Sequence, residues 1–233
     1  MKEQGRMKGG KLNVSKIKAF LEASYDVNDT NKNIHGYELD TEISNKWGKV
    51  FVNQLSRKVV IAHRGTRSTT DWANNAVMAL GAYQLTDRYK TGASLQQAAE
   101  FKYNGYKIYT IGHSQAGQLV HLLGKNTTGI SLNPAYMTPL KGEFQGKNEF
   151  VIRASFDPVS SLTKGMQNAA LSIMNPGYNA RNNIVIKSTT SDPLQEHAIT
   201  VLDRLPQDML IGRGKSNITY KINKDILKQY KNI

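Results

Sequence analysis

The chain has 233 residues, a formal net charge of +13 and no cysteine, with 39% hydrophobic and 21% charged residues. This length and apolar content fit one large α/β domain with a sizeable core, and they exclude a disordered chain. The lack of cysteine excludes a disulfide framework, a thiol nucleophile and a cysteine-based metal site, and it favours a reducing compartment.

The positive charge is concentrated at the two ends of the chain. Residues 1–18 and residues 212–233 each hold six Lys or Arg and one acid, so each end carries +5. Such ends are attracted to anionic lipid headgroups and to nucleic acid by the same field, or they serve only solubility. We expect a basic N-terminal arm over residues 1–14, a central domain over 15–205 and a basic C-terminal tail over 206–233.

The sequence lacks the signals that direct a chain into or across a membrane. The first residues are positively charged, but no apolar segment typical of a signal peptide follows them. No run of 18 apolar residues occurs anywhere in the sequence. We therefore expect a soluble, intracellular protein. For the basic ends, peripheral contact with an anionic membrane surface is favoured over nucleic acid.

Periodic apolar residues predict alternating helices and strands. Ser15 is expected to cap a first helix over residues 16–25, in which Ile17, Phe20 and Leu21 share one face. Further helices are expected over residues 71–80, 94–101 and 115–123. Strands are expected over residues 50–52, 59–62, 107–111, 129–133, 150–155 and 183–188. This alternation is typical of a mostly parallel central sheet with helices on both faces.

The segment TIGHSQAGQLV, residues 110–120, places a serine between a strand and an amphipathic helix. A sharp strand-to-helix turn strains the serine backbone, so the residues two before and two after it must be small. Gly112 and Ala116 meet this requirement, and the pattern is close to the G-x-S-x-G of a nucleophile elbow. The helix N-terminus would direct backbone N–H groups above Ser114, with Gln115 as one oxyanion donor.

A nucleophilic serine needs a histidine base and an acid, which follow it along the chain in this architecture. Of the five histidines, only His197 lies far downstream of Ser114. Asp157 follows an apolar strand and precedes a proline, which places it at the carboxyl end of the sheet, where open α/β sheets gather catalytic groups. Asp192, five residues before His197, is the second choice. The other acids considered are Asp203, Asp208 and Asp225.

Two motifs in this order resemble those of the class 3 lipases, an α/β-hydrolase family that includes fungal triacylglycerol lipases and many cellular phospholipases. One is GHSQAG, residues 112–117, and the other is VVIAHRGTRSTTDWANN, residues 59–75. The resemblance covers roughly residues 15–205. It implies that the backbone N–H and hydroxyl of Thr66 form the first half of the oxyanion hole, and that Gln115 supplies the second half.

The chain departs from the family pattern at two positions. Ala116 stands where glycine is usual, and His63 stands where phenylalanine is common before R-G-T. Neither change removes a catalytic group. In the resembling enzymes the segment after R-G-T forms or supports a lid. The apolar residues of 72–80 fit such a lid or a core-packing helix, and core packing is favoured.

The resemblance implies a serine acyl hydrolase of the lipase or phospholipase type, which acts on lipids through Ser114, Asp157 and His197 and needs no metal or cofactor. Two alternatives stay open. One is an inactive lipase-like binding or structural module whose basic tails hold nucleic acid or an acidic partner. The other is a non-lipid esterase or thioesterase. A binding module has no physical reason to retain the complete triad, whereas acyl-chain preference would separate a lipase from an esterase.

Overall fold

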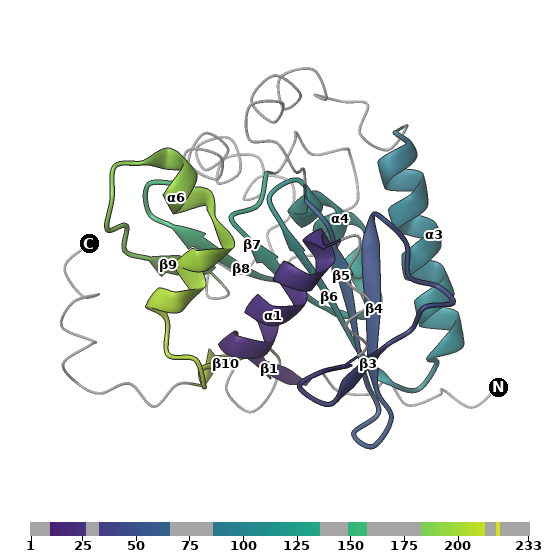
Figure 1. The fold of residues 1–233 in the computed structure, drawn as a ribbon. Helices are drawn as coiled ribbons and strands as arrows, with labels where there is room; N and C mark the ends of the chain where they lie inside the picture. The colour runs from purple at the N-terminus through teal and green to yellow at the C-terminus, as the bar shows by residue number, and fades with distance from the viewer. Residues whose placement is uncertain are drawn as a thin grey trace.

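The structure is a computed structural model, and it describes residues 10–26, 33–65, 86–135, 149–157, 183–212 and 218–219. Its main element is an eight-stranded sheet in the order β2-β3-β4-β5-β6-β7-β8-β9 (Figure 1). Strands β2 to β5 pair antiparallel, and strands β5 to β9 pair in parallel. The expected mostly parallel sheet of an α/β-hydrolase fold is thus confirmed.

The six strands predicted from the apolar runs all belong to this sheet. The two remaining strands, β2 and β3, are too short and too polar to be recognised by their pattern. The bounds are β2 (Asn33–Ile34), β3 (Tyr37–Leu39), β4 (Gly48–Asn53), β5 (Lys58–His63), β6 (Lys107–His113), β7 (Thr128–Leu132), β8 (Glu149–Ala154) and β9 (Asn183–Ile186).

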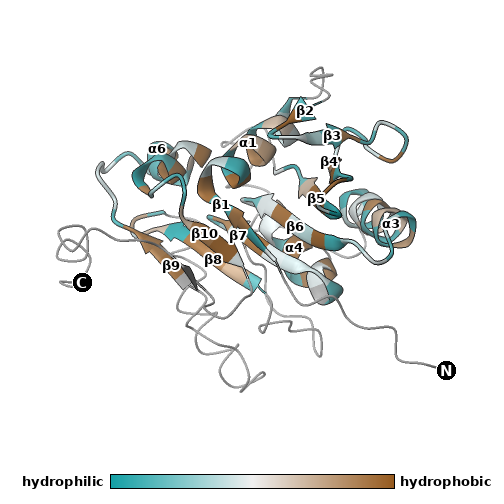
Figure 2. Cartoon of the chain, turned by 90° about the horizontal axis from the view of Figure 1, so that it is seen from below, coloured by the Kyte–Doolittle hydropathy of each residue, from teal (hydrophilic) through white to brown (hydrophobic). Residues whose placement is uncertain are grey.

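Helices cover both faces of the sheet, as the alternation of elements predicts (Figures 1 and 2). Helix α1 packs on one face together with the 3-10 helix η4, and α3 and α4 pack on the other. The bounds are α1 (Val14–Tyr25), α3 (Asp87–Lys102), α4 (Ala116–Leu123), η2 (Gly124–Asn126), α6 (Pro193–His197) and η4 (Ile199–Arg204). No helix in the described ranges is both long and apolar enough to cross a bilayer.

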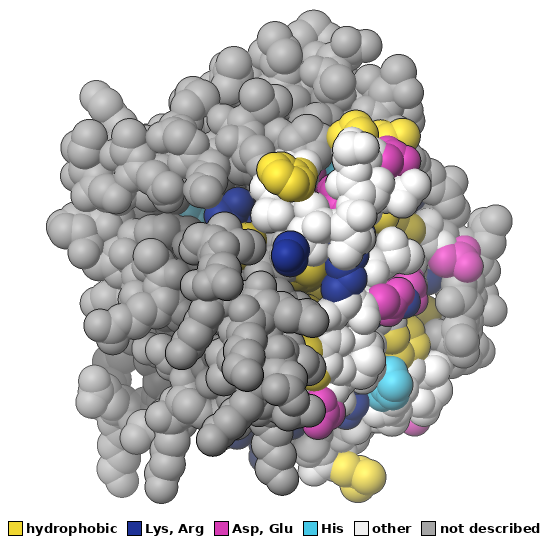
Figure 3. All heavy atoms as spheres, turned by 90° about the vertical axis from the view of Figure 1, so that its left-hand side faces the viewer, with side chains coloured by type: hydrophobic (Ala, Val, Ile, Leu, Met, Phe, Trp, Pro, Cys, Tyr) yellow, Lys and Arg dark blue, Asp and Glu magenta, His cyan; other side chains and the backbone are white. Residues whose placement is uncertain are grey.

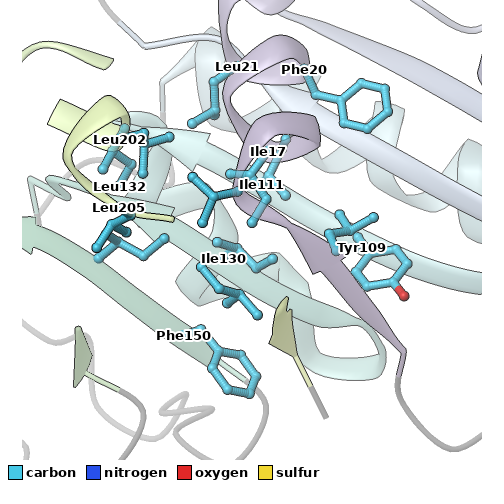
Figure 4. Packing of buried hydrophobic residues seen from close by; sticks show 14 of the residues in the cluster. Ile17, Phe20, Leu21, Tyr109, Ile111, Ile130, Leu132, Phe150, Leu202 and Leu205 are labelled. Carbon is cyan, nitrogen blue, oxygen red and sulfur yellow. The ribbon is translucent and has the colours of Figure 1, made fainter. Parts of the chain in front are cut away.

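The sheet separates the two larger clusters of the hydrophobic core, and a third, smaller cluster surrounds Leu119 of α4. Successive residues of a strand point to opposite faces, so Val60 and Ala62 of β5 pack on the α1 side, whereas Val59 and Ile61 pack on the α3 side. Figure 4 shows the larger cluster, in which apolar side chains of α1 lie over those of β6, β7 and β8. This double burial explains the continuous apolar runs of the central strands.

Two helix starts differ from the prediction because a side chain caps the helix at another residue. Helix α1 begins at Val14, since the Asn13 side chain accepts a hydrogen bond of 3.2 Å from the Lys16 N–H; Ser15 is therefore not its cap. Helix α3 begins at Asp87, well before residue 94, because Thr86 caps it by accepting from the Tyr89 N–H at 3.2 Å.

A second, three-stranded sheet joins residues from both ends of the chain. Strand β1 (Lys11–Asn13) pairs antiparallel with β10 (Leu210–Gly212), which pairs with β11 (Ile218–Thr219). These residues fall within the expected arm and tail, yet backbone hydrogen bonds hold them in a sheet. Residues 1–9, 213–217 and 220–233 of the arm and tail, and the helix expected over 71–80, lie outside the described residues.

We expect Phe20→Ala to lower the free energy of unfolding by about 3–5 kcal/mol, because it empties a buried site. The Phe20 ring is fully buried, and its centroid lies 5.1 Å from those of Tyr37 and Phe51. Phe101→Ala is the matched control: this side chain is 88% exposed, and its loss should change stability by less than about 0.5 kcal/mol. Urea denaturation measures both, and equal losses would contradict the packing described for α1.

Candidate active site

Ser114 occupies a strained turn between β6 and α4. Its φ of 59° lies in the left-handed region, which is unfavourable for a residue with a Cβ atom. The surrounding backbone holds it there: the Ser114 N–H donates to the Leu132 carbonyl at 3.0 Å. The Ser114 carbonyl accepts from the N–H groups of Gly117 at 2.9 Å and Ala135 at 3.0 Å. The expected sharp strand-to-helix turn is therefore present at this serine.

The turn brings Gly112 and Ala116 into direct contact. A Cβ atom on Gly112 would lie 2.5 Å from the Ala116 carbonyl oxygen and 3.0 Å from the Ala116 Cβ. The missing Cβ at position 112 therefore leaves room for the methyl group of Ala116, which is completely buried. This contact explains how alanine is accommodated where the resembling family usually has glycine.

Asp157 and His197, far apart in the sequence, meet in a buried hydrogen bond. The Asp157 side chain follows β8 and is completely buried. His197 is the last residue of α6, and its Nδ1 lies 2.7 Å from Asp157 Oδ1. This geometry fixes the tautomer when the ring is neutral, because Nδ1 must carry the proton that it donates. The Nε2 atom is then the basic nitrogen of the ring.

The other acids considered have different places. Asp192 is the N-cap of α6, where its Oδ1 accepts from the Leu194 N–H at 2.9 Å. Asp203 contacts Lys18 Nζ at 2.7 Å on the protein surface. Asp208 lies in the turn before β10, and Asp225 lies outside the described residues. Among the described acids, the structure therefore brings Asp157 to His197 and gives Asp192 a role in starting the helix.

The side chain of Asn133 ties together the three segments that carry the site. Its backbone N–H donates to the Ile152 carbonyl at 2.8 Å, and its Oδ1 accepts from the Ala154 N–H at 2.9 Å. Its Nδ2 donates to the Glu196 carbonyl at 2.9 Å. Asn133 is fully buried and follows β7. It therefore fixes the end of α6 relative to the ends of β7 and β8.

Glu196 anchors the loop before His197. Burial opposes ionisation of this carboxyl group, but hydrogen bonds from Arg204, from Ser188 and from the backbone of residues 189 and 190 outweigh it and lower the pKa to about 2. The Arg204 contact measures 2.7 Å between Nη1 and Oε2. Because Glu196 stays ionised down to strongly acidic pH, its hydrogen bonds to Arg204 and to the loop persist at neutral and mildly acidic pH.

His113 connects the serine turn to His197. Its Nε2 lies 2.7 Å from the His197 carbonyl oxygen, so Nε2 carries a proton and donates it. Its Nδ1, 2.7 Å from the Tyr25 hydroxyl, must then accept from that hydroxyl. Burial and the neighbouring His197 lower the pKa of His113 to about 3. The ring thus remains neutral and connects Tyr25 to His197 through its two hydrogen bonds. Its centroid lies 4.9 Å from that of the His197 ring.

Arg64 and Gly65, the residues that follow β5, lie close to the serine turn. The backbone of Gly65 hydrogen-bonds the Tyr25 hydroxyl, which links this segment to His113. A Cβ atom on Gly65 would lie 2.6 Å from the His113 carbonyl oxygen, so only glycine fits here. Gln115, the other expected oxyanion donor, is the buried residue directly before α4. Thr66 lies outside the described residues.

His63, which stands where the family commonly has phenylalanine, is fully buried in a polar network. Its Nε2 donates to Gln96 Oε1 at 3.2 Å, and Gln96 Nε2 donates to Thr110 Oγ1 at 2.9 Å. Burial and the charge of Arg88 lower the pKa of His63 to about 4, although the Gln96 contact opposes this shift. The imidazole is therefore neutral at physiological pH.

Several residues of this site carry no signal in the sequence. Tyr25 looks like the end of an ordinary helix, and Asn133 like the last residue of an apolar strand before proline. His113 belongs to the elbow motif, but the motif does not reveal its hydrogen bonds to Tyr25 and His197. In the part of the chain that the structure describes, no group of three or more His, Cys, Asp or Glu side chains could hold a metal ion.

No family model matches the sequence, and no curated protein matches it. Solved structures that are similar include Lip2 lipase from Yarrowia lipolytica, which is 14% identical over 66% of this chain and 78% of that chain, with a TM-score of 0.42. The mono- and diacylglycerol lipase from Aspergillus oryzae is 19% identical over 64% and 71%, with a TM-score of 0.42. A triacylglycerol lipase from Penicillium expansum is 15% identical over 74% and 77%, with a TM-score of 0.45. The likeness is distant and is one of fold.

We expect His63→Phe to reduce the loss of stability at acid pH. His63 binds a proton near pH 6.5 in the unfolded chain but only near pH 4 in the folded one, so falling pH favours unfolding. Between pH 7.5 and pH 4.5 this difference in pKa lowers the free energy of unfolding by roughly 2–3 kcal/mol. Urea denaturation measures the free energy of unfolding at both pH values. Its decrease from pH 7.5 to pH 4.5 should be smaller in the variant than in the wild type by this amount. Equal decreases in both proteins would contradict the neutral, buried state of His63.

Proposed function

We propose that this protein is a serine hydrolase of carboxylic esters, with Ser114 as nucleophile, His197 as general base and Asp157 as the acid that orients it. One observation carries the proposal. Ser114 is held at a φ of 59° and directly follows His113 in the sequence. The His113 ring hydrogen-bonds the His197 carbonyl, and the His197 ring is paired with Asp157. A strained exit from a strand and a separate, buried His–Asp pair have no shared structural purpose, but nucleophilic catalysis requires both.

In this mechanism the proton moves between Ser114 and His197. The Ser114 Oγ forms a bond with the ester carbonyl carbon while its proton passes to His197 Nε2. The leaving alcohol then takes that proton, which leaves an acyl group on Ser114. Water attacks the acyl carbon, gives its proton to Nε2, and the acid departs as Ser114 regains its hydrogen. Asp157 stabilises the imidazolium that forms twice in each cycle.

Backbone N–H groups would stabilise the negative charge that develops on the carbonyl oxygen. In the proposal, Gln115 provides one such group at the start of α4, and Thr66 provides the other. A donor of this kind is worth about 2.7–4 kcal/mol of barrier, because the charge forms where the dipoles are already oriented.

Apolar side chains beside the site favour lipid esters as substrates. Phe156 directly precedes Asp157 and is 71% exposed, and Leu194, three residues before His197, is 56% exposed. Figure 3 views the side of the molecule on which α6 and β9 lie, and apolar side chains are exposed near the top of its described part. Large exposed apolar groups are costly in water, so a lipid acyl chain or lipid surface is a suitable partner.

A fluorophosphonate probe tests the activated serine directly. We expect a single covalent adduct on Ser114, located by mass spectrometry, and no adduct in Ser114→Ala, which should also lose ester hydrolysis while unfolding at the same temperature. Ser24→Ala is a matched control, because that hydroxyl is buried but donates only to the Leu21 carbonyl. Absence of labelling in the well-folded wild type would favour an inactive, lipase-like binding module.

The choice of acid is tested by two isosteric changes. We expect Asp157→Asn to lower kcat by roughly 10³–10⁴-fold, because the amide disfavours the required tautomer of His197. Asp192→Asn should change kcat by less than threefold, since asparagine also caps helices well. Initial rates with a short-chain p-nitrophenyl ester measure both variants. The reverse ordering would assign the acid to Asp192.

The lipid preference is tested with soluble and aggregated substrates. Replacement of Phe156 and Leu194 by serine should reduce hydrolysis of a long-chain ester in vesicles at least tenfold and leave hydrolysis of a soluble acetate ester within twofold. Phe101→Ser, which removes a side chain that is 88% exposed on α3, serves as control. Equal losses on both substrates would argue for a non-lipid esterase.

A further inference from the structure

Arg88 extends from the first turn of α3 toward both segments of the proposed oxyanion hole. Its Nη2 donates a short hydrogen bond to the backbone carbonyl of Arg64, which begins the R-G-T segment. Its Nη1 lies 3.4 Å from the side-chain oxygen of Gln115, the residue that follows Ser114. One planar guanidinium therefore connects the end of β5 to the start of α4.

The guanidinium of Arg88 is also held from the side by an aromatic ring. Its Cζ lies 5.4 Å from the centre of the Trp47 ring, and the Cζ of Arg64 lies 4.9 Å from the same centre. The Trp47 carbonyl accepts from the Arg64 N–H at 2.9 Å, so the ring is tied to the segment that it supports. Cation–π contacts of this kind restrict where a guanidinium can lie.

Among the described residues, Arg88 forms no salt bridge with a carboxylate. Within the described ranges, the ion pairs join other cations to carboxylates, and none includes Arg88. Its hydrogen bonds go to neutral oxygens of the two segments instead. The planar guanidinium of arginine can donate to two acceptors at a fixed separation, whereas the flexible ammonium group of lysine cannot.

We infer that Arg88 is a positioning residue that sets the separation of residues 64 and 65 from Gln115 and so, under the proposed function, aligns the oxyanion donors. The inference rests on the proposed function, which assigns the oxyanion role to these segments. Since catalysis depends on donor geometry, a displacement of about 1 Å can cost about 100-fold in rate. Arg88 acts through the Arg64 carbonyl and the Gln115 side chain and does not itself contact the ester.

Three variants isolate the effect of the guanidinium. Arg88→Met retains an unbranched side chain but removes the donors, and Arg88→Lys retains the charge but cannot bridge both acceptors. Arg57→Met is the matched control, because the Arg57 guanidinium also stacks on an aromatic ring, with Cζ 5.1 Å from the centre of Tyr106, at the distant β4–β5 turn. Urea denaturation of each variant checks that the protein is folded.

The kinetic readout compares a p-nitrophenyl ester with its thionoester, in which sulfur replaces the carbonyl oxygen. The donors of an oxyanion hole stabilise a negatively charged oxygen better than sulfur, so the ester reacts faster than the thionoester. Misaligned donors should therefore reduce the ratio of the ester rate to the thionoester rate. Arg88→Met should lower kcat about 10–100-fold, with KM within twofold and the ratio reduced about tenfold. Arg88→Lys should recover less than a tenth of the lost activity, and Arg57→Met should match wild type. An unchanged ratio, or full recovery by lysine, would overturn the inference.

Backbone amide exchange tests the same inference without activity. Arg88→Met should accelerate exchange in peptides that cover residues 61–65 and 113–118, and leave β7 and β8 unchanged, whereas Arg57→Met should accelerate neither peptide. A wild type that hydrolyses no ester and takes no fluorophosphonate would refute the proposed function, yet accelerated exchange would still support the connection made by Arg88. Unchanged exchange in both peptides would overturn the connection whether or not the protein is active.

Discussion

The left-handed backbone of Ser114 is the constraint around which the rest of the site is arranged. That conformation costs free energy, and hydrogen bonds to Leu132 and Ala135 stabilise it. It also brings residue 112 so close to the backbone of Ala116 that residue 112 must lack a side chain. Because these contacts come from β7 and the residues after it, the turn and the parallel sheet support each other. A serine elsewhere on the sheet would have no comparable set of contacts.

Neutral hydrogen-bonded side chains connect the segments that meet at this turn. Tyr25, His113 and Asn133 each join elements that are distant in sequence, and each finds its partners among backbone groups or uncharged side chains. Hydrogen bonds of this kind are directional, so they specify one arrangement, and they add no further buried charge beside the His197–Asp157 pair. The carboxylate of Glu196 is instead paired with the guanidinium of Arg204 at 2.7 Å.

The sequence predicts the parts of this fold that depend on local pattern. Apolar runs locate the central strands, and the small residues around Ser114 predict its turn. The prediction is incomplete where distant residues decide the structure. The start of α3 lies in a stretch containing Lys90 and Gly92, with little apolar periodicity, and only its cap and its packing fix it. Arg88 looks like a surface residue, and only the fold brings it near Gln115.

The pairing of β1 with β10 has a consequence for the order in which the protein can form. Lys11 is opposite Gly212, so β1, the first described strand, pairs with β10, which lies about 200 residues later in the sequence. On a ribosome, β1 emerges before the eight-stranded sheet but stays without this partner until β10 has been synthesised, because contacts between distant residues require a long loop to close. The smaller sheet can therefore be completed only after the elements that carry Ser114 have left the ribosome.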